Sequence, residues 1–183
     1  MELGYRWSLD FAGPLPVTPR HNKYVLVMIE HFSKWIELVA LPDKFSEGAT
    51  YSFLDRVLSR FGARAEVLTD QGREFLGEFQ TLCEQAMIDH RTTSRDHPEA
   101  DGLAERMVQT VKRGLRKYSL NKGHHGDWDL QLPWIAMGYR FSKQASLASF
   151  SPYYLLFGRH PVLPKAIQAD ADTVLANMDN PDT

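Results

Sequence analysis

The run Tyr24-Val25-Leu26-Val27-Met28-Ile29 is continuously apolar and decides the fold class. Such a run suits a central β-strand that is buried on both faces. Before it, residues 7–11 alternate between apolar and polar side chains, which predicts a second strand with Asp10 on its polar side. After it, residues 35–41 form a third strand candidate, which Pro42 ends.

The rest of the chain alternates between helices and short strands. A helix is predicted from Ser46, its N-cap, to Phe61, because apolar residues recur at helical spacing up to Gly62. The order of elements indicates a mixed α/β domain. It is compatible with a ribonuclease-H-like sheet of about five strands flanked by helices, although periodicity alone leaves other topologies open. The remaining predicted elements are a strand at 65–68 that delivers Asp70 at its carboxyl end, a helix at 77–86, a strand near 91–93, a loop bracketed by His97-Pro98 and Gly102, and helices at 102–118, 128–141 (with a kink or a late start at Pro133) and 152–157.

Length and composition indicate one globular domain. The 183 residues suffice for one well-buried core, which we place in residues 1–165, with 166–183 as a flexible tail. The contents of 43% hydrophobic and 24% charged residues are those of a soluble protein. No run approaches the roughly 20 apolar residues of a membrane span, so no membrane partner is expected. The single cysteine, Cys83, excludes an internal disulfide and any zinc site that needs two cysteines, and it favours a reducing compartment.

The predicted helix at 102–118 carries the most information about function. Its stretch from Arg106 to Lys122 contains six basic residues and no acid, although the whole chain has a net charge of −2. On a wheel of about 100° per residue, Gln109, Lys112 and Arg116 fall within about 40° of Glu105. One interpretation is a metal-binding carboxylate followed by phosphate-binding side chains, and the alternative is an ordinary solvated helix face. The opposite side is apolar and predicted to face the core, with Leu103, Met107, Val111, Leu115 and Tyr118.

Five segments, in order along the chain, together resemble the catalytic core of gypsy-type retrotransposon and retroviral integrases, members of the DDE superfamily. They are WSLDFAGPLP (7–16), HFSKW (31–35), TDQGREF (69–75), HPEADGLAER (97–106) and SPYYLLFGRHP (151–161).

By this resemblance, Asp10, Asp70 and Glu105 match the three metal-binding acids of the family. The resemblance implies a polynucleotidyl transferase that trims donor DNA ends and joins them to a target duplex with two Mg²⁺ or Mn²⁺ ions. Asp10 would bridge the ions, and Asp70 and Glu105 would each hold one. Lys112, Arg116 and Gln109 would contact DNA. The resemblance also implies a homo-oligomer and a location in the nucleus of a eukaryotic host.

The sequence departs from the family pattern in two places. Asp70 and Glu105 are separated by 34 residues (71–104), one fewer than is usual, and the missing residue falls between Phe79 and Cys83. The segment before Glu105 has Asp96, Glu99, Ala100, Leu103 and Ala104 where the family commonly has tyrosine, glutamine, threonine, glutamine and threonine.

Two other functions stay open at this point. A nuclease of the same fold would use similar acids, and a host-adopted core could bind DNA or protein without catalysis.

Overall fold

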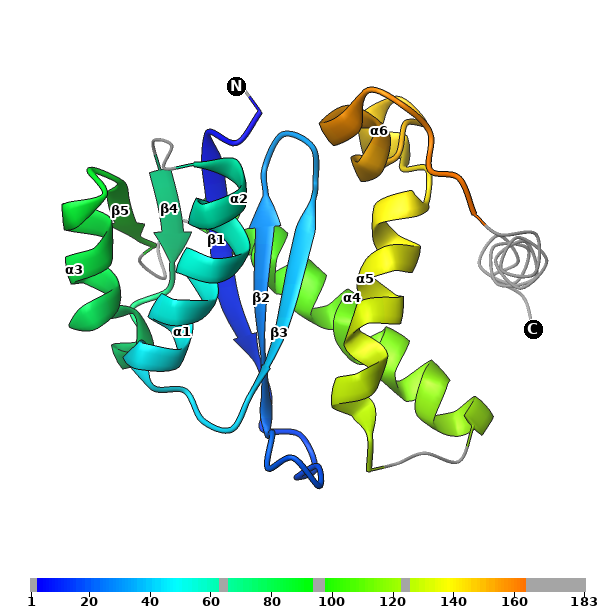
Figure 1. Cartoon of the computed structure of the whole chain (residues 1–183), viewed down its shortest axis with the longest axis horizontal. Coiled ribbons are helices and arrows are strands. Elements are labelled where there is room, and N and C mark those ends of the chain that lie inside the picture. The colour runs from blue at the N-terminus through cyan, green and yellow to red at the C-terminus, as the bar shows by residue number, and fades with distance from the viewer. Residues whose placement is uncertain (1–2, 63–65, 94–97, 123–125, 164–183) are drawn as a thin grey trace.

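A mixed sheet of five strands lies at the centre of the domain (Figure 1). The computed structural model describes residues 3–62, 66–93, 98–122 and 126–163. The strand order is β3-β2-β1-β4-β5, in which β1, β2 and β3 form an antiparallel meander, and β4 and β5 run parallel to β1. This arrangement confirms the predicted mixed sheet. The strands are β1 (Arg6–Ala12), β2 (Tyr24–Glu30), β3 (Ile36–Leu41), β4 (Glu66–Thr69) and β5 (Asp89–Thr92).

Helices cover both faces of the sheet. In Figure 1 the helices that follow β3 and β4 lie in front of the sheet, and the long helix α4 (Pro98–Lys122) passes behind it. The helix α5 (Leu132–Phe141) packs beside β3. The other helical segments are α1 (Ser46–Phe53), η1 (Leu54–Leu58), α2 (Ser59–Phe61), η2 (Arg73–Phe75), α3 (Glu78–Gln85), η3 (Trp128–Gln131), η4 (Ala145–Leu147) and α6 (Pro152–Phe157).

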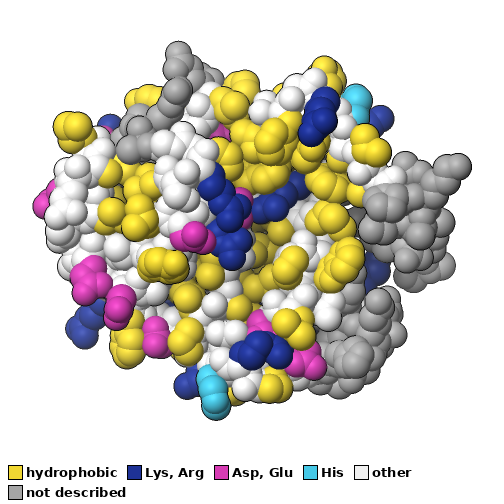
Figure 2. All heavy atoms as spheres, in the orientation of Figure 1, with side chains coloured by type: hydrophobic (Ala, Val, Ile, Leu, Met, Phe, Trp, Pro, Cys, Tyr) yellow, Lys and Arg dark blue, Asp and Glu magenta, His cyan; other side chains and the backbone are white. Residues whose placement is uncertain are grey.

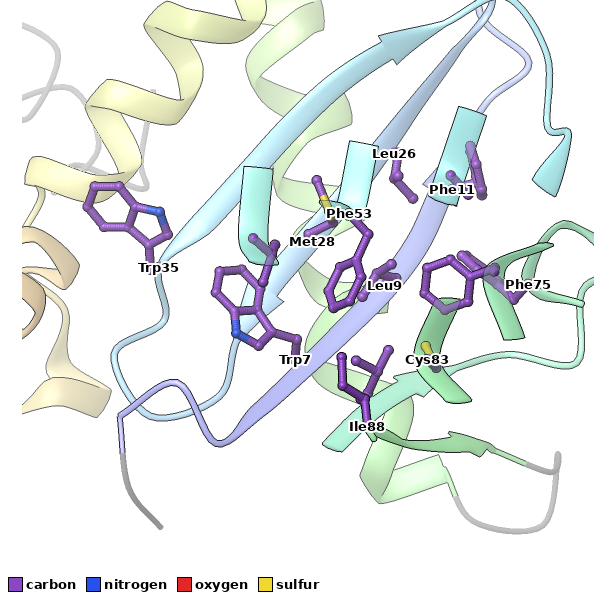
Figure 3. Packing of buried hydrophobic residues seen from close by; sticks show 14 residues of the cluster. Trp7, Leu9, Phe11, Leu26, Met28, Trp35, Phe53, Phe75, Cys83 and Ile88 are labelled. Carbon is purple, nitrogen blue, oxygen red and sulfur yellow. The ribbon is translucent and has the colours of Figure 1, made fainter. Parts of the chain in front are cut away.

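The core has two halves, one on each face of the sheet. Trp7, Leu9 and Phe11 of β1 pack against the front helices, in a cluster that includes Phe53 and Phe79 (Figure 3). On the other face, the alternate residues of β2 pack against α4 and α5. Every side chain of β2 after Tyr24 is buried, which confirms the prediction of a central strand.

Several predicted boundaries differ from the structure. β5 spans Asp89–Thr92 rather than 91–93, because pairing with β4 sets its length. The helix α4 spans Pro98–Lys122 rather than 102–118, and it begins at Pro98 since proline suits a first helical turn. The predicted helix 128–141 is η3 followed by α5, and Pro133 lies in the first turn of α5, which confirms the late start.

The assignment of Ser46 as an N-cap was wrong. Phe45 occupies that position, and no side chain caps the helix. The Ser46 hydroxyl instead donates to the carbonyl oxygen of Leu76 (2.6 Å) and accepts from the backbone N–H of Phe79 (3.1 Å). The Ser46 hydroxyl, which the local sequence assigns to helix capping, therefore makes tertiary hydrogen bonds instead. His97 and residues 164–183, including the predicted tail, lie outside the described residues.

Candidate active site

Asp10 lies on the face of the sheet that α4 covers. Side chains alternate between the two faces of a strand, and Leu9 and Phe11 belong to the front half of the core. Asp10 therefore points to the opposite face, together with Ala12, which packs in the cluster that includes α4. The Asp10 side chain is half-buried, and one of its oxygens accepts a hydrogen bond from the backbone N–H of Phe11 at 2.7 Å.

Asp70 follows a strand that pairs in parallel with the strand of Asp10. β1 and β4 pair with Ser8 opposite Leu68. The pairing ends there, and Asp70 follows two residues later, directly after the last residue of β4. Asp70 follows the last residue of β4 and is half-buried, and its Oδ1 accepts a hydrogen bond from the N–H of Gly72 at 3.0 Å.

Glu105 belongs to the helix that crosses this same face. α4 packs against β1 and β2, and its neighbouring residues Ala104 and Val108 are fully or almost fully buried. Glu105 itself is exposed, at the side of the helix next to its buried stripe. The fold thus brings together the three elements that carry or precede the predicted acids, because β1, β4 and α4 contact one another.

The side chains of the three acids are not arranged as a complete metal-binding site. Within the described residues, which include all three acids, no group of three Asp, Glu, His or Cys side chains is arranged to hold one ion. The donor set nevertheless fits a hard divalent cation, which prefers carboxylate oxygens. Backbone N–H groups fix one oxygen of Asp10 and one of Asp70. The metal-binding role of the three acids therefore stays a prediction.

The predicted DNA-binding side chains are available at the surface. Gln109 and Arg116 are exposed and Lys112 is half-buried. Met107, Val111 and Leu115 are buried against the sheet, which confirms the predicted apolar side of this helix. Leu103 is half-buried, and the side chain of Tyr118 lies outside the described residues. The two-sided character of α4 is confirmed, while contact with phosphates stays a prediction.

A histidine near the site is uncharged at neutral pH. The His31 ring nitrogen Nε2 lies 2.6 Å from the Ser8 hydroxyl oxygen, two residues before Asp10 on the same strand. Burial, and then the positive charges of Lys34 and Arg6, lower the pKa of His31 to about 4. The His31 ring therefore carries no positive charge at neutral pH.

An ion pair next to Asp70 was missed by the sequence analysis. Lys44 Nζ lies 2.6 Å from Glu74 Oε1 and 5.2 Å from the centre of the Phe11 ring. Glu74 belongs to the segment TDQGREF, one of those that carry the family resemblance, so the sequence offered a signal for it. Nothing in the sequence distinguishes Lys44 from other lysines. The contact joins the loop before α1 to η2, 30 positions away along the chain, and arises only from the fold.

Comparison with known proteins identifies the family. The family model of the integrase core domain matches residues 2–98, which is more than half of the chain. The chain belongs to the integrase core domain family. The matched range contains Asp10 and Asp70 and ends before Glu105.

Retroviral and retrotransposon polyproteins are among the relatives of this integrase core. The chain is 31% identical over 161 residues to a Pol polyprotein of Radiation murine leukemia virus, with 87% of the chain and 27% of that protein covered. It is 27% identical over 162 residues to a retrovirus-related Pol polyprotein from transposon 412 of Drosophila melanogaster, with 87% and 13% covered. The chain thus spans about a quarter or less of the length of these relatives.

Solved structures confirm the ribonuclease-H-like fold. A chain of the simian T-cell lymphotropic virus intasome in complex with the PP2A regulatory subunit B56 gamma has a TM-score of 0.73 at 21% identity, with 88% of this chain and 58% of that one covered. The HTLV-2 integrase catalytic core domain in complex with magnesium has a TM-score of 0.66 at 20% identity, with 82% and 94% covered. Among the described residues of this integrase core, no helix is long and apolar enough to cross a membrane.

Proposed function

We propose that this integrase core trims donor DNA ends and joins them to target DNA, with Asp10, Asp70 and Glu105 as its catalytic acids. One observation carries the proposal. β4, which Asp70 follows directly, pairs in parallel with β1, which carries Asp10, and α4, which bears Glu105, packs against β1. Acids on or directly after three contacting elements of an integrase core are suited to bind hard cations.

The three acids would hold two Mg²⁺ or Mn²⁺ ions. When bound, such ions relieve negative charge at phosphorus and activate an oxygen nucleophile. By resemblance to the family, Asp10 would hold both ions, and Asp70 and Glu105 would each hold one. The backbone N–H groups of Phe11 and Gly72 orient the two aspartates before any ion arrives.

The stripe on α4 would bind the DNA backbone. Lys112 and Arg116 neutralise phosphates, and Gln109 donates from its amide, one turn after Glu105. Because this contact is to phosphates, its strength depends on salt and little on base sequence. A DNA strand held along α4 passes Glu105 and so reaches the acids.

Assembly and location belong to the same proposal. A second copy of the chain would occupy the face that carries α1 and α5, where hydrophobic side chains are plentiful at the surface (Figure 2). Tyr51 of α1, Leu54 of η1 and Trp134 of α5 are 68%, 43% and 50% exposed. A protein that joins DNA ends to host DNA would act in the nucleus of a eukaryotic host.

An oligonucleotide assay separates this function from a nuclease or a non-catalytic module. Labelled donor ends are incubated with a target duplex and Mg²⁺ or Mn²⁺, and products are resolved by size. Joined product supports the integrase, cutting alone a nuclease, and binding alone a module. Asp43→Asn is the matched control for Asp70→Asn, because both remove one charge and Asp43 lies before α1, outside the three acids.

A further inference from the structure

Two loops meet at the end of the sheet where Asp70 lies. The loop after β3 carries Lys44, and the segment after β4 carries Glu74. Lys44 Nζ lies 2.6 Å from Glu74 Oε1, and Ser46 is hydrogen-bonded to the backbone of Leu76 and Phe79. These contacts fix the segment that begins with Asp70 against the start of α1.

Within this segment, the Glu74 carboxylate folds back toward Asp70. A Cβ atom built on Gly72 would lie 2.7 Å from Glu74 Oε2 and 2.8 Å from Asp70 Oδ1. The two oxygens are therefore no more than about 5.5 Å apart, the sum of those distances. One water molecule can bridge that gap, because two hydrogen bonds of about 2.8 Å span it.

Glu74 and Lys44 differ in exposure. The Glu74 side chain is 11% exposed, and that of Lys44 is 39% exposed. Lys44 also lies against the ring of Phe11, the residue after Asp10. A negative charge thus stands next to Asp70, and the positive charge that pairs with it lies against Phe11, on the opposite face of the sheet from Asp10.

We propose that Glu74 is a positioning residue of the metal site, acting on a bound cation through water and through its charge, and that Lys44 weakens this action by pairing with it. The inference rests on the proposed function. Mg²⁺ keeps several waters in protein sites, and groups that bind those waters tune the affinity for the ion. Glu74 therefore needs no direct bond to the ion.

The opposite signs of the two charges make the proposal testable. Glu74→Gln removes an attractive charge and should weaken Mn²⁺ binding about tenfold. Lys44→Gln removes a repulsive charge that lies further away, and it should strengthen Mn²⁺ binding about two- to fivefold. A merely structural ion pair would be broken equally by either change, so both variants would then shift the affinity in the same direction.

The measurement is a titration of the folded chain with Mn²⁺, without DNA, followed by electron paramagnetic resonance of the free ion. Thermal unfolding checks each variant, and Lys44→Arg, which keeps the charge, should bind Mn²⁺ like the parent. The double variant should fall between the two single variants. Shifts of the same sign, or no shift in Glu74→Gln, would overturn the proposal.

Asp70→Asn separates this failure from a failure of the proposed function. One possible result is that the parent binds Mn²⁺, that Asp70→Asn abolishes this binding, and that Glu74→Gln leaves it unchanged. In that case only the role of Glu74 is rejected. If Asp70→Asn binds Mn²⁺ like the parent, the metal site itself is misplaced, and both proposals fail.

Discussion

Asp129 in η3 is hydrogen-bonded to the loop between β1 and β2 and so holds that loop against η3. Its Oδ2 accepts hydrogen bonds from Thr18 Oγ1 (2.9 Å), Arg20 Nε (2.8 Å) and Asn22 Nδ2 (2.8 Å). Its Oδ1 accepts from Arg20 Nη2 and from the backbone N–H of Leu130. The Asp129 side chain is only 3% exposed. One buried carboxylate therefore satisfies donors of a loop more than 100 residues away.

Replacing Asp129 by asparagine should destabilise the domain by about 3 kcal/mol. The amide oxygen can keep the three donors of Oδ2, but the NH₂ group then faces Arg20 Nη2 and the N–H of Leu130. Two hydrogen bonds are lost, one of them to a charged group, and donors face donors. For a domain of this size the melting temperature should fall by roughly 6 to 12 °C.

The effect of this substitution should depend on pH. Hydrogen bonds from Arg20, and then from Asn22 and Thr18, hold the pKa of Asp129 well below its usual range. Since the pKa is lower in the folded state than in the unfolded chain, the stabilisation is complete above about pH 4 and is lost as the pH falls toward the folded-state pKa. The difference between parent and variant should therefore be largest at neutral pH and shrink below about pH 4.

Urea unfolding at several pH values measures both effects. Asp127→Asn is the control, because Asp127 is 40% exposed, contacts the same Arg20, and should change stability by less than about 1 kcal/mol. An Asp129→Asn variant as stable as this control would refute the reasoning. So would a difference from the parent that stays constant down to about pH 3.

Three further predictions concern the site. Lys112→Glu with Arg116→Glu should weaken binding to unrelated DNA sequences alike and reduce the salt slope by about 2, measured by fluorescence anisotropy. Arg159→Glu, at an exposed position just after α6, is the control, and unchanged binding of the double variant at low salt would mean that this side of α4 is an ordinary solvated helix face. Asp70→Asn should abolish end joining with either metal yet melt no lower than the parent, because one of several mutually repelling acids is gone; joining at the parental rate would exclude Asp70. Gly72→Ala should weaken Mn²⁺ binding about tenfold, since its Cβ would lie within 2.8 Å of two carboxylates. Gly138→Ala, whose Cβ would have nothing within 4 Å, is the control and should bind Mn²⁺ like the parent. Equal Mn²⁺ affinities of the two variants would contradict the prediction for Gly72.

The local pattern of the sequence was sufficient for the strands that carry the acids. The alternation of residues 7–11 predicts both β1 and the face on which Asp10 lies, because side-chain direction in a strand depends only on neighbouring positions. The same holds for α4, whose buried residues Met107, Val111 and Leu115 repeat at helical spacing. The family resemblance then ordered these elements into a ribonuclease-H-like sheet.

Contacts between distant segments could not be predicted in this way. The pairing that brings β4, which Asp70 follows, beside β1 joins strands about 60 residues apart. The Ser46 hydroxyl matched a local capping rule but bonds to Leu76, 30 positions away. Lys44 and Glu74 carry no periodic signal, so only the packed loops reveal their contact.

The charges around the site lead to one more consequence of the proposed function. Asp10, Asp70 and Glu74 place negative charge where a DNA phosphate would have to approach, while Lys112 and Arg116 attract phosphates from the neighbouring helix. Without metal ions the two groups of side chains oppose each other, and with ions the repulsion is removed. Metal and DNA should therefore each raise the affinity for the other, since coupling between two binding events is reciprocal. The acidic net charge of the chain is compatible with DNA binding on this basis, because the ions supply the positive charge that the residues at the site lack.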